Sequence, residues 1–253
     1  MATVIMDFDK TVADTFLPSP NGIGVERAYE VAVEECFGVD ALKNFRKTGG
    51  LKNRAPGEVV AQFNGGESSV ELTQNLVRAK LACLINEIGK TGADGRTWPP
   101  IYPGFAEFLR RLDDMQWLWA VLSSGHGDFI RKTFAVHSLP RPRVFSDDEA
   151  SRLPGYPCKP NPVLLEVACQ ETGISFQPEE MMYIGDDPVK DGGLAKNAGL
   201  QFGWFAPDGV KSNMLLPAKS FVFNDWQILA NLMRENAGTL KEGVSLAELF
   251  TQL

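Results

Sequence analysis

The sequence predicts an α/β protein in which a doubly wound, Rossmann-like parallel sheet is joined by a smaller all-helical domain. Short apolar runs of strand length recur along the chain, and helical patterns separate the later runs. That alternation is typical of parallel strands joined by crossover helices. The runs cover residues 3–6, 118–122, 181–184, 202–205 and 221–223.

The stretch from about residue 16 to residue 100 differs from the rest of the chain. No strand-like run interrupts it, and its apolar residues recur at helical spacing. One stripe comprises Val25, Tyr29, Ala32 and Cys36, and another comprises Val77, Leu81, Leu84 and Ile88. We therefore expect a helical insertion over residues 16–100, within a core formed by residues 1–15 and 101–253.

Three local signals indicate where further helices begin. Ser68 with Glu71 fits a capping box ahead of the second stripe. Asn161 followed by Pro162 fits a helix N-cap and first position. The last segment, residues 243–253, has the pattern of an amphipathic helix that would cover the core.

The composition limits the classes of function. The chain has 253 residues with 32 Asp or Glu and 25 Lys or Arg, so its net charge is −7. That charge argues against a nucleic-acid surface as the main function. The four cysteines contain no C-x-x-C pair, and no apolar segment has the ~18 residues of a membrane span. We expect a cytoplasmic protein with reduced thiols and neither a nucleic-acid nor a membrane partner.

Polar side chains directly follow three of the predicted strands. The carboxyl ends of parallel strands meet at one edge of a sheet, so residues far apart in the chain converge on one crevice there. The residues after the strands are Asp7 and Asp9, Ser123 and Ser124, and Asp186 and Asp187. Lys159, in the loop sequence YPCKPNP, would reach the same edge. Asp7 and Asp9 repel each other at their spacing, and a metal ion, a phosphoryl group or a solvated turn would each account for the pair.

Four short motifs occur in a recognisable order. They read DFDKT, LSS, CKP and GDDPVKD. In this order they resemble the motifs of the haloacid dehalogenase superfamily, over about residues 1–15 and 101–225. The resemblance implies a doubly wound core with a helical cap inserted after the first motif. It also implies a Mg²⁺-dependent phosphatase that hydrolyses a small phosphomonoester through an aspartyl-phosphate.

The resemblance implies roles for residues of the first three motifs. Asp7 resembles the nucleophile that forms the aspartyl-phosphate. Asp9 resembles the general acid/base that protonates the leaving oxygen and then activates water. Ser123 resembles the hydroxyl that binds the phosphate, with Ser124 beside it as a substrate-binding residue. Lys159 would add a positive charge next to the phosphoryl oxygens and Asp7.

The resemblance also implies a Mg²⁺ site. Asp7, the backbone carbonyl of Asp9 and Asp186 match the protein ligands of the family. Oxygen donors of this kind are those that Mg²⁺ takes in proteins. Asp187 is either an alternative ligand or a residue just outside the ligands, and the sequence does not separate these two roles.

Further residues are expected around the site. Asp191 resembles the acidic residue that positions Lys159, and Thr11 is expected beside the metal ligands. Arg54 lies in a loop-like segment that resembles the substrate-specificity loop of capped family members, with Lys52 as the second choice. Its guanidinium would fit an anionic substrate tail. A solvated basic loop accounts for Arg54 equally well.

Alternative functions would use the same residues. A sugar phosphomutase would return the phosphoryl group to its substrate. A dehalogenase would make little use of Asp9 as an acid/base. A phosphonate hydrolase would need a cap lysine, and nothing singles one out. A binding protein that kept the fold without catalysis would be expected to lack a catalytic carboxylate, yet Asp7, Asp9 and Asp186 are all present. The motifs leave open which phosphorylated metabolite is the partner and what the oligomeric state is. They also leave open the role of Lys10, which stands where glycine is common in the family.

Overall fold

The computed structural model describes residues 2–51, 55–155, 157–210, 216–217, 219–241 and 248. The chain divides into two compact units, one formed by Met1–Asp14 with Ile101–Leu253 and the other by Thr15–Pro100. Lys52 and Arg54 lie outside the described residues, as does the predicted terminal helix apart from residue 248. Among the described residues, no helix combines the length and the apolar character needed to span a bilayer.

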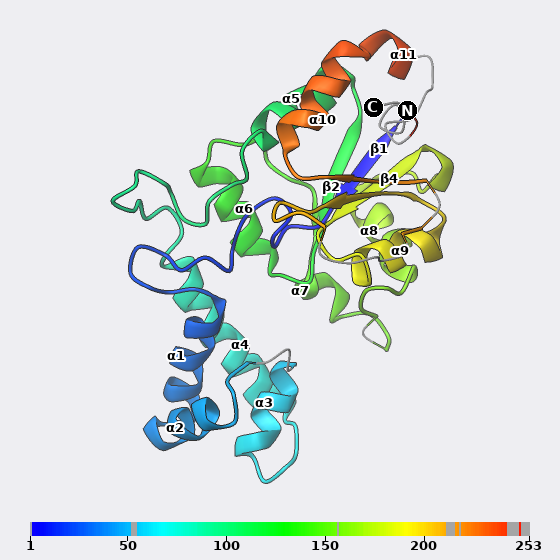
Figure 1. Cartoon of the computed structure of the whole chain (residues 1–253). Coiled ribbons are helices and arrows are strands. Elements are labelled where there is room, and N and C mark those ends of the chain that lie inside the picture. Colours follow the sequence, from blue (N-terminus) through cyan, green and yellow to red (C-terminus); the bar gives the residue numbers. More distant parts are fainter. Residues whose placement is uncertain are drawn as a thin grey trace. The chain divides into compact units, whose positions relative to one another are not determined.

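The larger unit is built on a six-stranded sheet in which every neighbouring pair of strands is parallel. The strands are β1 (Thr3–Met6), β2 (Leu118–Leu122), β3 (Val144–Phe145), β4 (Met181–Gly185), β5 (Gln201–Phe205) and β6 (Ser220–Phe223). Their order is β3-β2-β1-β4-β5-β6, with β1 between β2 and β4 (Figure 1). The chain therefore winds outward from β1 in both directions, and the predicted doubly wound α/β class is confirmed.

Five of the strands match the predicted apolar runs to within one residue at each end. The sixth strand, β3, is not among those runs because two residues are too few to show a hydrophobic period. It pairs with the end of β2, Val121 opposite Val144 and Leu122 opposite Phe145. The residues that follow β3 therefore lie beside the loop that follows β2.

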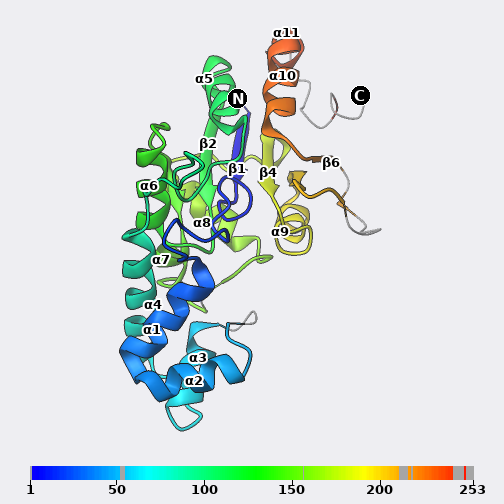
Figure 2. The same ribbon diagram turned by 60° about the vertical axis from the view of Figure 1, so that its left-hand side comes forward.

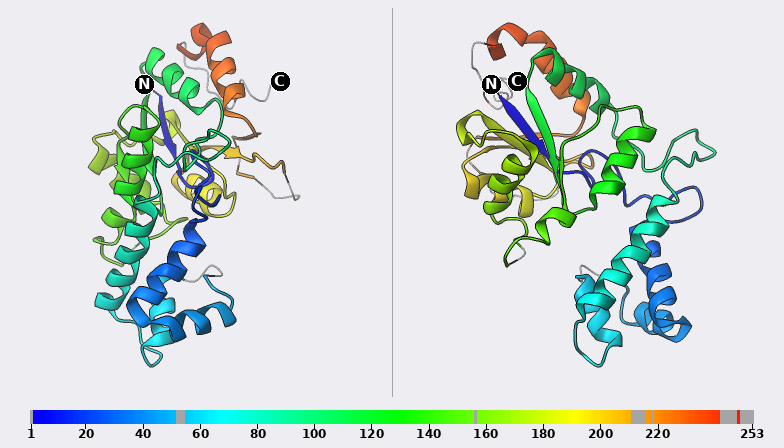
Figure 3. Two further views of the ribbon diagram at one scale, coloured as in Figure 1. Left: turned by 90° about the vertical axis from the view of Figure 1, so that its left-hand side faces the viewer. Right: turned by 180° about the vertical axis from the view of Figure 1, so that it is seen from behind.

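Helices cover both faces of the sheet (Figure 1). On one face lie α5 (Phe105–Asp114), α6 (Gly127–Val136) and α10 (Trp226–Glu235), and on the other lie α7 (Asp147–Ala150), α8 (Val163–Thr172) and α9 (Lys190–Ala198). The α5 and α10 helices run side by side, green and orange in both views of Figure 3. Phe105 packs against Trp226 and Phe134, with ring centroids 5.0 and 6.0 Å apart. On the opposite face Leu165 and Leu194 share one buried core with Tyr183.

Two short helical segments complete the larger unit, and one predicted helix start is displaced. The segments are the 3-10 helix Pro178–Glu180 and α11 (Ala237–Lys241). The α8 helix begins one residue later than predicted, with Pro162 at the N-cap. Asn161 still contributes, because its Oδ1 accepts a hydrogen bond of 3.1 Å from the Val163 backbone N–H.

Among its described residues the smaller unit contains four helices, of which α1 and α4 pack along each other (Figure 2). They are α1 (Val25–Phe37), α2 (Val39–Lys47), α3 (Pro56–Phe63) and α4 (Val70–Ile85). Residues from all four, including Tyr29, Phe45, Val59 and Leu76, form one buried core. The predicted capping box is wrong by one residue: Ser69 rather than Ser68 is the N-cap of α4, and its Oγ accepts from the Leu72 N–H over 3.4 Å.

Candidate active site

Lys159 joins two carboxylates at the carboxyl edge of the sheet. Its Nζ donates to Asp7 Oδ1 over 2.7 Å and to Asp191 Oδ1 over 2.8 Å. Asp7 directly follows β1, and Asp191 lies in the first turn of α9, so three separate stretches of chain meet here. All three side chains are buried. Burial alone would lower the pKa of Lys159, but the charges of Asp191 and Asp7 outweigh it and raise that pKa well above its ordinary value, so the side chain stays an ammonium.

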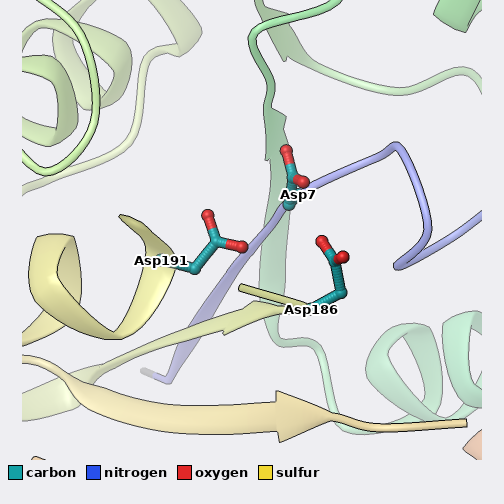
Figure 4. Close-up of side chains that lie close together, drawn as sticks. All are labelled: Asp7, Asp186 and Asp191. Atoms are coloured by element: carbon teal, nitrogen blue, oxygen red, sulfur yellow. The ribbon is translucent and has the colours of Figure 1, made fainter. Parts of the chain in front are cut away.

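Asp7, Asp186 and Asp191 form an acidic cluster in which the side chains approach one another (Figure 4). One carboxylate oxygen from each lies within 4.8 Å of the other two. Burial raises the pKa of Asp7, that of Asp186 to about 7 and that of Asp191 to about 6. Lys159 is the ammonium that hydrogen-bonds to Asp7 and Asp191, so negative charge is in excess when all three carboxyl groups are ionised. Hard oxygen donors arranged in this way could hold a metal ion.

Hydrogen bonds distinguish Asp191 and Asp187 from the other carboxylates. Asp191 uses Oδ1 for Lys159 and Oδ2 for the Asp187 backbone N–H, which lies at 3.1 Å. Asp187 Oδ1 accepts from two backbone N–H groups at the start of α9, over 2.9 and 3.0 Å. These two hydrogen bonds occupy Asp187 Oδ1. Asp7 and Asp186 are therefore the carboxylates with the greatest remaining capacity for a cation.

Thr11 supports Asp186 from the segment after β1. Its buried Oγ1 donates to Asp186 Oδ1 over 3.4 Å. Two indoles that the sequence analysis does not single out hold the backbone of these residues: Trp226 Nε1 donates to the Thr11 carbonyl and Trp204 Nε1 to the Asp186 carbonyl, each over 3.0 Å. A residue of β5 thus holds the backbone of Asp186, and a residue of α10 holds the backbone of Thr11, the partner of Asp186.

The loop after β2 brings Ser123 close to Asp9. The Oγ of Ser123 is buried and accepts from the Gly125 N–H over 3.0 Å, so its own hydrogen remains to be donated. A Cβ on Gly125 would lie 3.0 Å from Asp9 Oδ2 and 3.3 Å from Ser123 Oγ. Ser124 is exposed and lines, with Ser123 and Lys159, a cavity of about 20 Å³.

Tyr183 is a contact of the site that the sequence analysis does not single out. It lies in β4 with its ring centroid 5.3 Å from Lys159 Nζ, and its hydroxyl donates to the Leu122 carbonyl over 3.0 Å. Burial raises its pKa well above the ordinary value, so the phenol stays neutral. The sequence signal for this contact is a tyrosine inside an otherwise apolar strand, and that signal does not indicate that Lys159 is the partner.

Lys10 adopts a backbone conformation that favours glycine, with φ +58°. It lies with Asp186 on the lining of a cavity of about 310 Å³ whose wall includes Tyr102 and Trp204. The charge of Lys10 partly opposes the rise in the pKa of Asp186. The cavity therefore adjoins the acidic cluster on the side of β5.

Comparisons with known proteins agree with this architecture. The haloacid dehalogenase-like hydrolase family model matches residues 1–199. Among solved structures, a family IA variant 3 hydrolase from Entamoeba histolytica is 13% identical, with 99% of this chain and 98% of that chain covered and a TM-score of 0.64. A phosphatase of the family from Thermococcus onnurineus is 16% identical over 92% of this chain and 98% of that chain, with a TM-score of 0.59.

A third similar structure carries the name of a different reaction. It is a 2-haloacid dehalogenase from Pseudomonas syringae, 19% identical over 93% of this chain and 99% of that chain, with a TM-score of 0.56. A search of curated proteins gave no match.

The fold and the site define an α/β protein with a carboxylate and lysine centre at the carboxyl edge of its sheet. The chain belongs to the haloacid dehalogenase-like hydrolase family.

Proposed function

We propose that the chain is a Mg²⁺-dependent phosphatase that hydrolyses a small phosphomonoester through an aspartyl-phosphate on Asp7. The observation that carries this proposal is the setting of Asp7, buried at the end of β1 with its Oδ1 2.7 Å from the Lys159 ammonium. A carboxylate nucleophile must approach a phosphoryl group of like charge. Positive charge beside both groups lowers that repulsion.

Two displacements at phosphorus complete the reaction. In the first, a carboxylate oxygen of Asp7 forms a bond to phosphorus, the bond to the leaving oxygen breaks, and Asp9 donates a proton to that oxygen. In the second, Asp9 takes a proton from water, the water oxygen attacks phosphorus, and the bond to Asp7 breaks. Inorganic phosphate leaves, and both carboxylates return to their starting state.

The donor set fits Mg²⁺. Asp7 and Asp186 would hold the cation together with the backbone carbonyl of Asp9, which are the oxygen ligands that it prefers. The raised pKa of Asp186 and the excess negative charge of the cluster support this assignment. When bound, the cation would offset the charge of the phosphoryl oxygens. Asp191 would hold Lys159 in place, and Asp187 would fix the start of α9.

Binding residues complete the proposal. Ser123 would donate its hydroxyl hydrogen to a phosphoryl oxygen, with exposed Ser124 beside it. Arg54 would bind an anionic tail of the substrate from the helical unit. The partner would be a small phosphorylated metabolite in the cytoplasm.

Asp9 favours phosphatase over dehalogenase chemistry. Displacement of a halide from carbon expels a weakly basic ion that needs no proton, whereas an alkoxide leaving group does. The carboxylate of Asp9 lies against the same glycine as the Ser123 hydroxyl, where it would serve a leaving oxygen. This second carboxylate supports phosphoryl chemistry.

The test is hydrolysis of p-nitrophenyl phosphate and of a panel of phosphorylated metabolites, with phosphate release measured directly. We expect turnover that a chelator abolishes and that Mg²⁺ restores. Ca²⁺ should inhibit, because its larger and more flexible coordination shell would misplace Asp7. Undiminished hydrolysis in excess chelator would rule out the metal-dependent mechanism. Transfer of phosphate to a second substrate position without release would indicate the phosphomutase instead.

A further inference from the structure

A buried imidazole lies in the same loop as Ser123 and has no part in the chemistry proposed above. The side chain of His126 is 10% exposed. His126 stands at the N-cap of α6 but makes no capping bond to that helix. Its ring turns instead to α7, where Nδ1 lies 2.9 Å from Asp148 Oδ1. The side chain of Asp148 is 40% exposed, so the imidazole is the buried member of this pair.

Asp148 holds both the imidazole and the backbone of the loop. Its second oxygen, Oδ2, accepts from the Gly127 N–H over 2.9 Å. The hydrogen bond from His126 is the main cause that lowers the pKa of Asp148 to about 2, so this carboxylate is ionised at neutral pH. An ionised carboxylate can only accept hydrogen bonds, and Nδ1 of His126 must therefore carry the hydrogen in this contact.

Two backbone hydrogen bonds run beside this pair. The Ser123 N–H donates to the Phe145 carbonyl over 3.1 Å, and the Asp147 N–H donates to the Gly125 carbonyl over 3.0 Å. Residues 123–127 are thus joined to residues 145–148 at successive points. The parallel pairing of β2 with β3 places the two segments side by side.

The loop held in this way carries the atoms that would meet the phosphoryl group. Gly125 donates its N–H to Ser123 Oγ, and a Cβ on Gly125 would lie only 3.0 Å from Asp9 Oδ2. A displacement of the loop would change both the direction of the Ser123 hydroxyl and the clearance around Asp9. Misplacement by ~1 Å is enough to cost a catalytic site about a hundredfold.

We propose that His126 and Asp148 are positioning residues, which fix the Ser123–Gly127 loop for binding of the phosphoryl group. This inference rests on the proposed phosphatase function. The pair acts through the loop and does not contact substrate. Its loss should weaken affinity for phosphate in both its free and its esterified form.

The experiment compares two amides at position 126. In His126→Asn the amide N–H takes the place of Nδ1–H, whereas in His126→Gln it lies one bond farther out, nearer the place of Nε2. We expect His126→Gln to raise the Kd of inorganic phosphate and the KM of p-nitrophenyl phosphate roughly tenfold or more. We expect His126→Asn to keep both constants near the wild-type values. Asp148→Ala should behave like His126→Gln, because it removes the acceptor of both the His126 Nδ1–H and the Gly127 N–H. His137→Gln, at the other end of α6, is the matched control and should match the wild type.

Phosphate affinity is measured by calorimetry in the presence of Mg²⁺, so the readout does not need turnover, and thermal unfolding is followed for each variant. Wild-type affinity in His126→Gln, or equal losses in His126→Asn and His126→Gln, would overturn the positioning role. A wild-type protein that neither binds phosphate nor hydrolyses any ester would refute the proposed function itself. The two failures are therefore distinguishable.

Discussion

The carboxylate of Asp191 fills the space beside Gly185 where any other residue would place a side chain. A Cβ on Gly185 would lie 2.5 Å from the Cβ of Asp191 and closer still to its carboxylate. Gly185 is the last residue of β4, and Asp191 lies in the first turn of α9. The missing side chain at the end of the strand is what lets the helix bring Asp191 to Lys159.

Gly185→Ala should therefore reduce activity, although the substitution replaces no charged residue. The new methyl would push Asp191 away and lengthen its 2.8 Å contact with Lys159. A hydrogen bond to a charged group contributes about 1.5 to 3 kcal/mol, so we expect a lower Tm and a loss of kcat of roughly ten to a hundredfold. Gly238→Ala is the control, because a Cβ there meets nothing within 4 Å. Full activity in Gly185→Ala would show that the Asp191 position is unimportant.

Most of the fold could be predicted because burial on both faces makes parallel strands read as continuous apolar runs. The exception, β3, has two residues and gives no such run. That omission matters, since β3 leads into Asp148 and thereby places it beside His126. The displaced start of α4 has a different cause: Ser68 and Ser69 are both good caps, and sequence alone cannot decide between neighbours.

The sequence predicts which residues share the candidate site only where those residues directly follow a strand. Asp7, Ser123 and Asp186 each come directly after a strand, so their common edge follows from parallel topology. The contact of Tyr183 with Lys159 and the approach of Asp191 to Gly185 depend on which helix packs where. No spacing in the sequence encodes those distances.

Protons and a cation should compete for Asp186. Burial is the main cause that raises its pKa from 3.8 to about 7. In the metal-free protein this carboxyl is protonated below that pH and becomes a buried charge above it, so its contribution to the free energy of unfolding falls as the pH rises through about 7. Mg²⁺ needs the ionised form and offsets its charge. We therefore expect Mg²⁺ to raise Tm more at about pH 8 than at about pH 6.

This pH dependence has a specific control. Asp186→Asn removes the titrating group, so the gain in Tm from Mg²⁺ should shrink and lose most of its dependence on pH. Thermal unfolding at matched ionic strength, with and without the cation, measures both effects. An identical gain at the two pH values in the unmodified protein would contradict the assignment of Asp186 to the cation site.

Lys10 should carry a conformational cost that glycine relieves. A residue with a side chain costs about 1 to 2 kcal/mol in the left-handed region, where Lys10 has φ +58°. Because glycine also adds freedom to the unfolded chain, we expect Lys10→Gly to raise the free energy of unfolding by up to about 1 kcal/mol. Lys10→Ala removes the same charge without relieving the backbone and should show no such gain. Equal denaturation midpoints for the two variants would refute a backbone origin.

Arg54 offers a test of substrate recognition by the helical unit. We expect Arg54→Ala to weaken catalysis on the true substrate while sparing p-nitrophenyl phosphate, which has no anionic tail. A charge-assisted hydrogen bond contributes about 1.5 to 3 kcal/mol, so kcat/KM should fall roughly ten to a hundredfold. Lys52→Ala, in the same segment, tests the second choice, and a loss confined to that variant would assign the contact to Lys52 instead. Equal losses on both esters would mean that Arg54 supports folding instead.

Asp9 should separate the two halves of the reaction. Asp7 must be ionised to attack, whereas Asp9 must first hold a proton for the leaving oxygen and later remove one from water. Asp9→Asn keeps the size of the side chain and removes its acid/base function. We expect it to slow an alkyl phosphate by about 10² to 10⁴, the usual range for general acid/base catalysis.

An aryl phosphate should respond to the same substitution in a different way. Its leaving group departs with little need of a proton, so attack by Asp7 survives in Asp9→Asn while attack of water on the aspartyl-phosphate is impaired. Rapid mixing should then show a burst of about one aryl alcohol per active site, followed by slow turnover. The unmodified protein, in which the second step keeps its base, is the control. If Asp9→Asn hydrolyses both esters at the unmodified rate, Asp9 is a structural residue of the turn after β1, and the chemistry proposed for the pair of carboxylates is wrong.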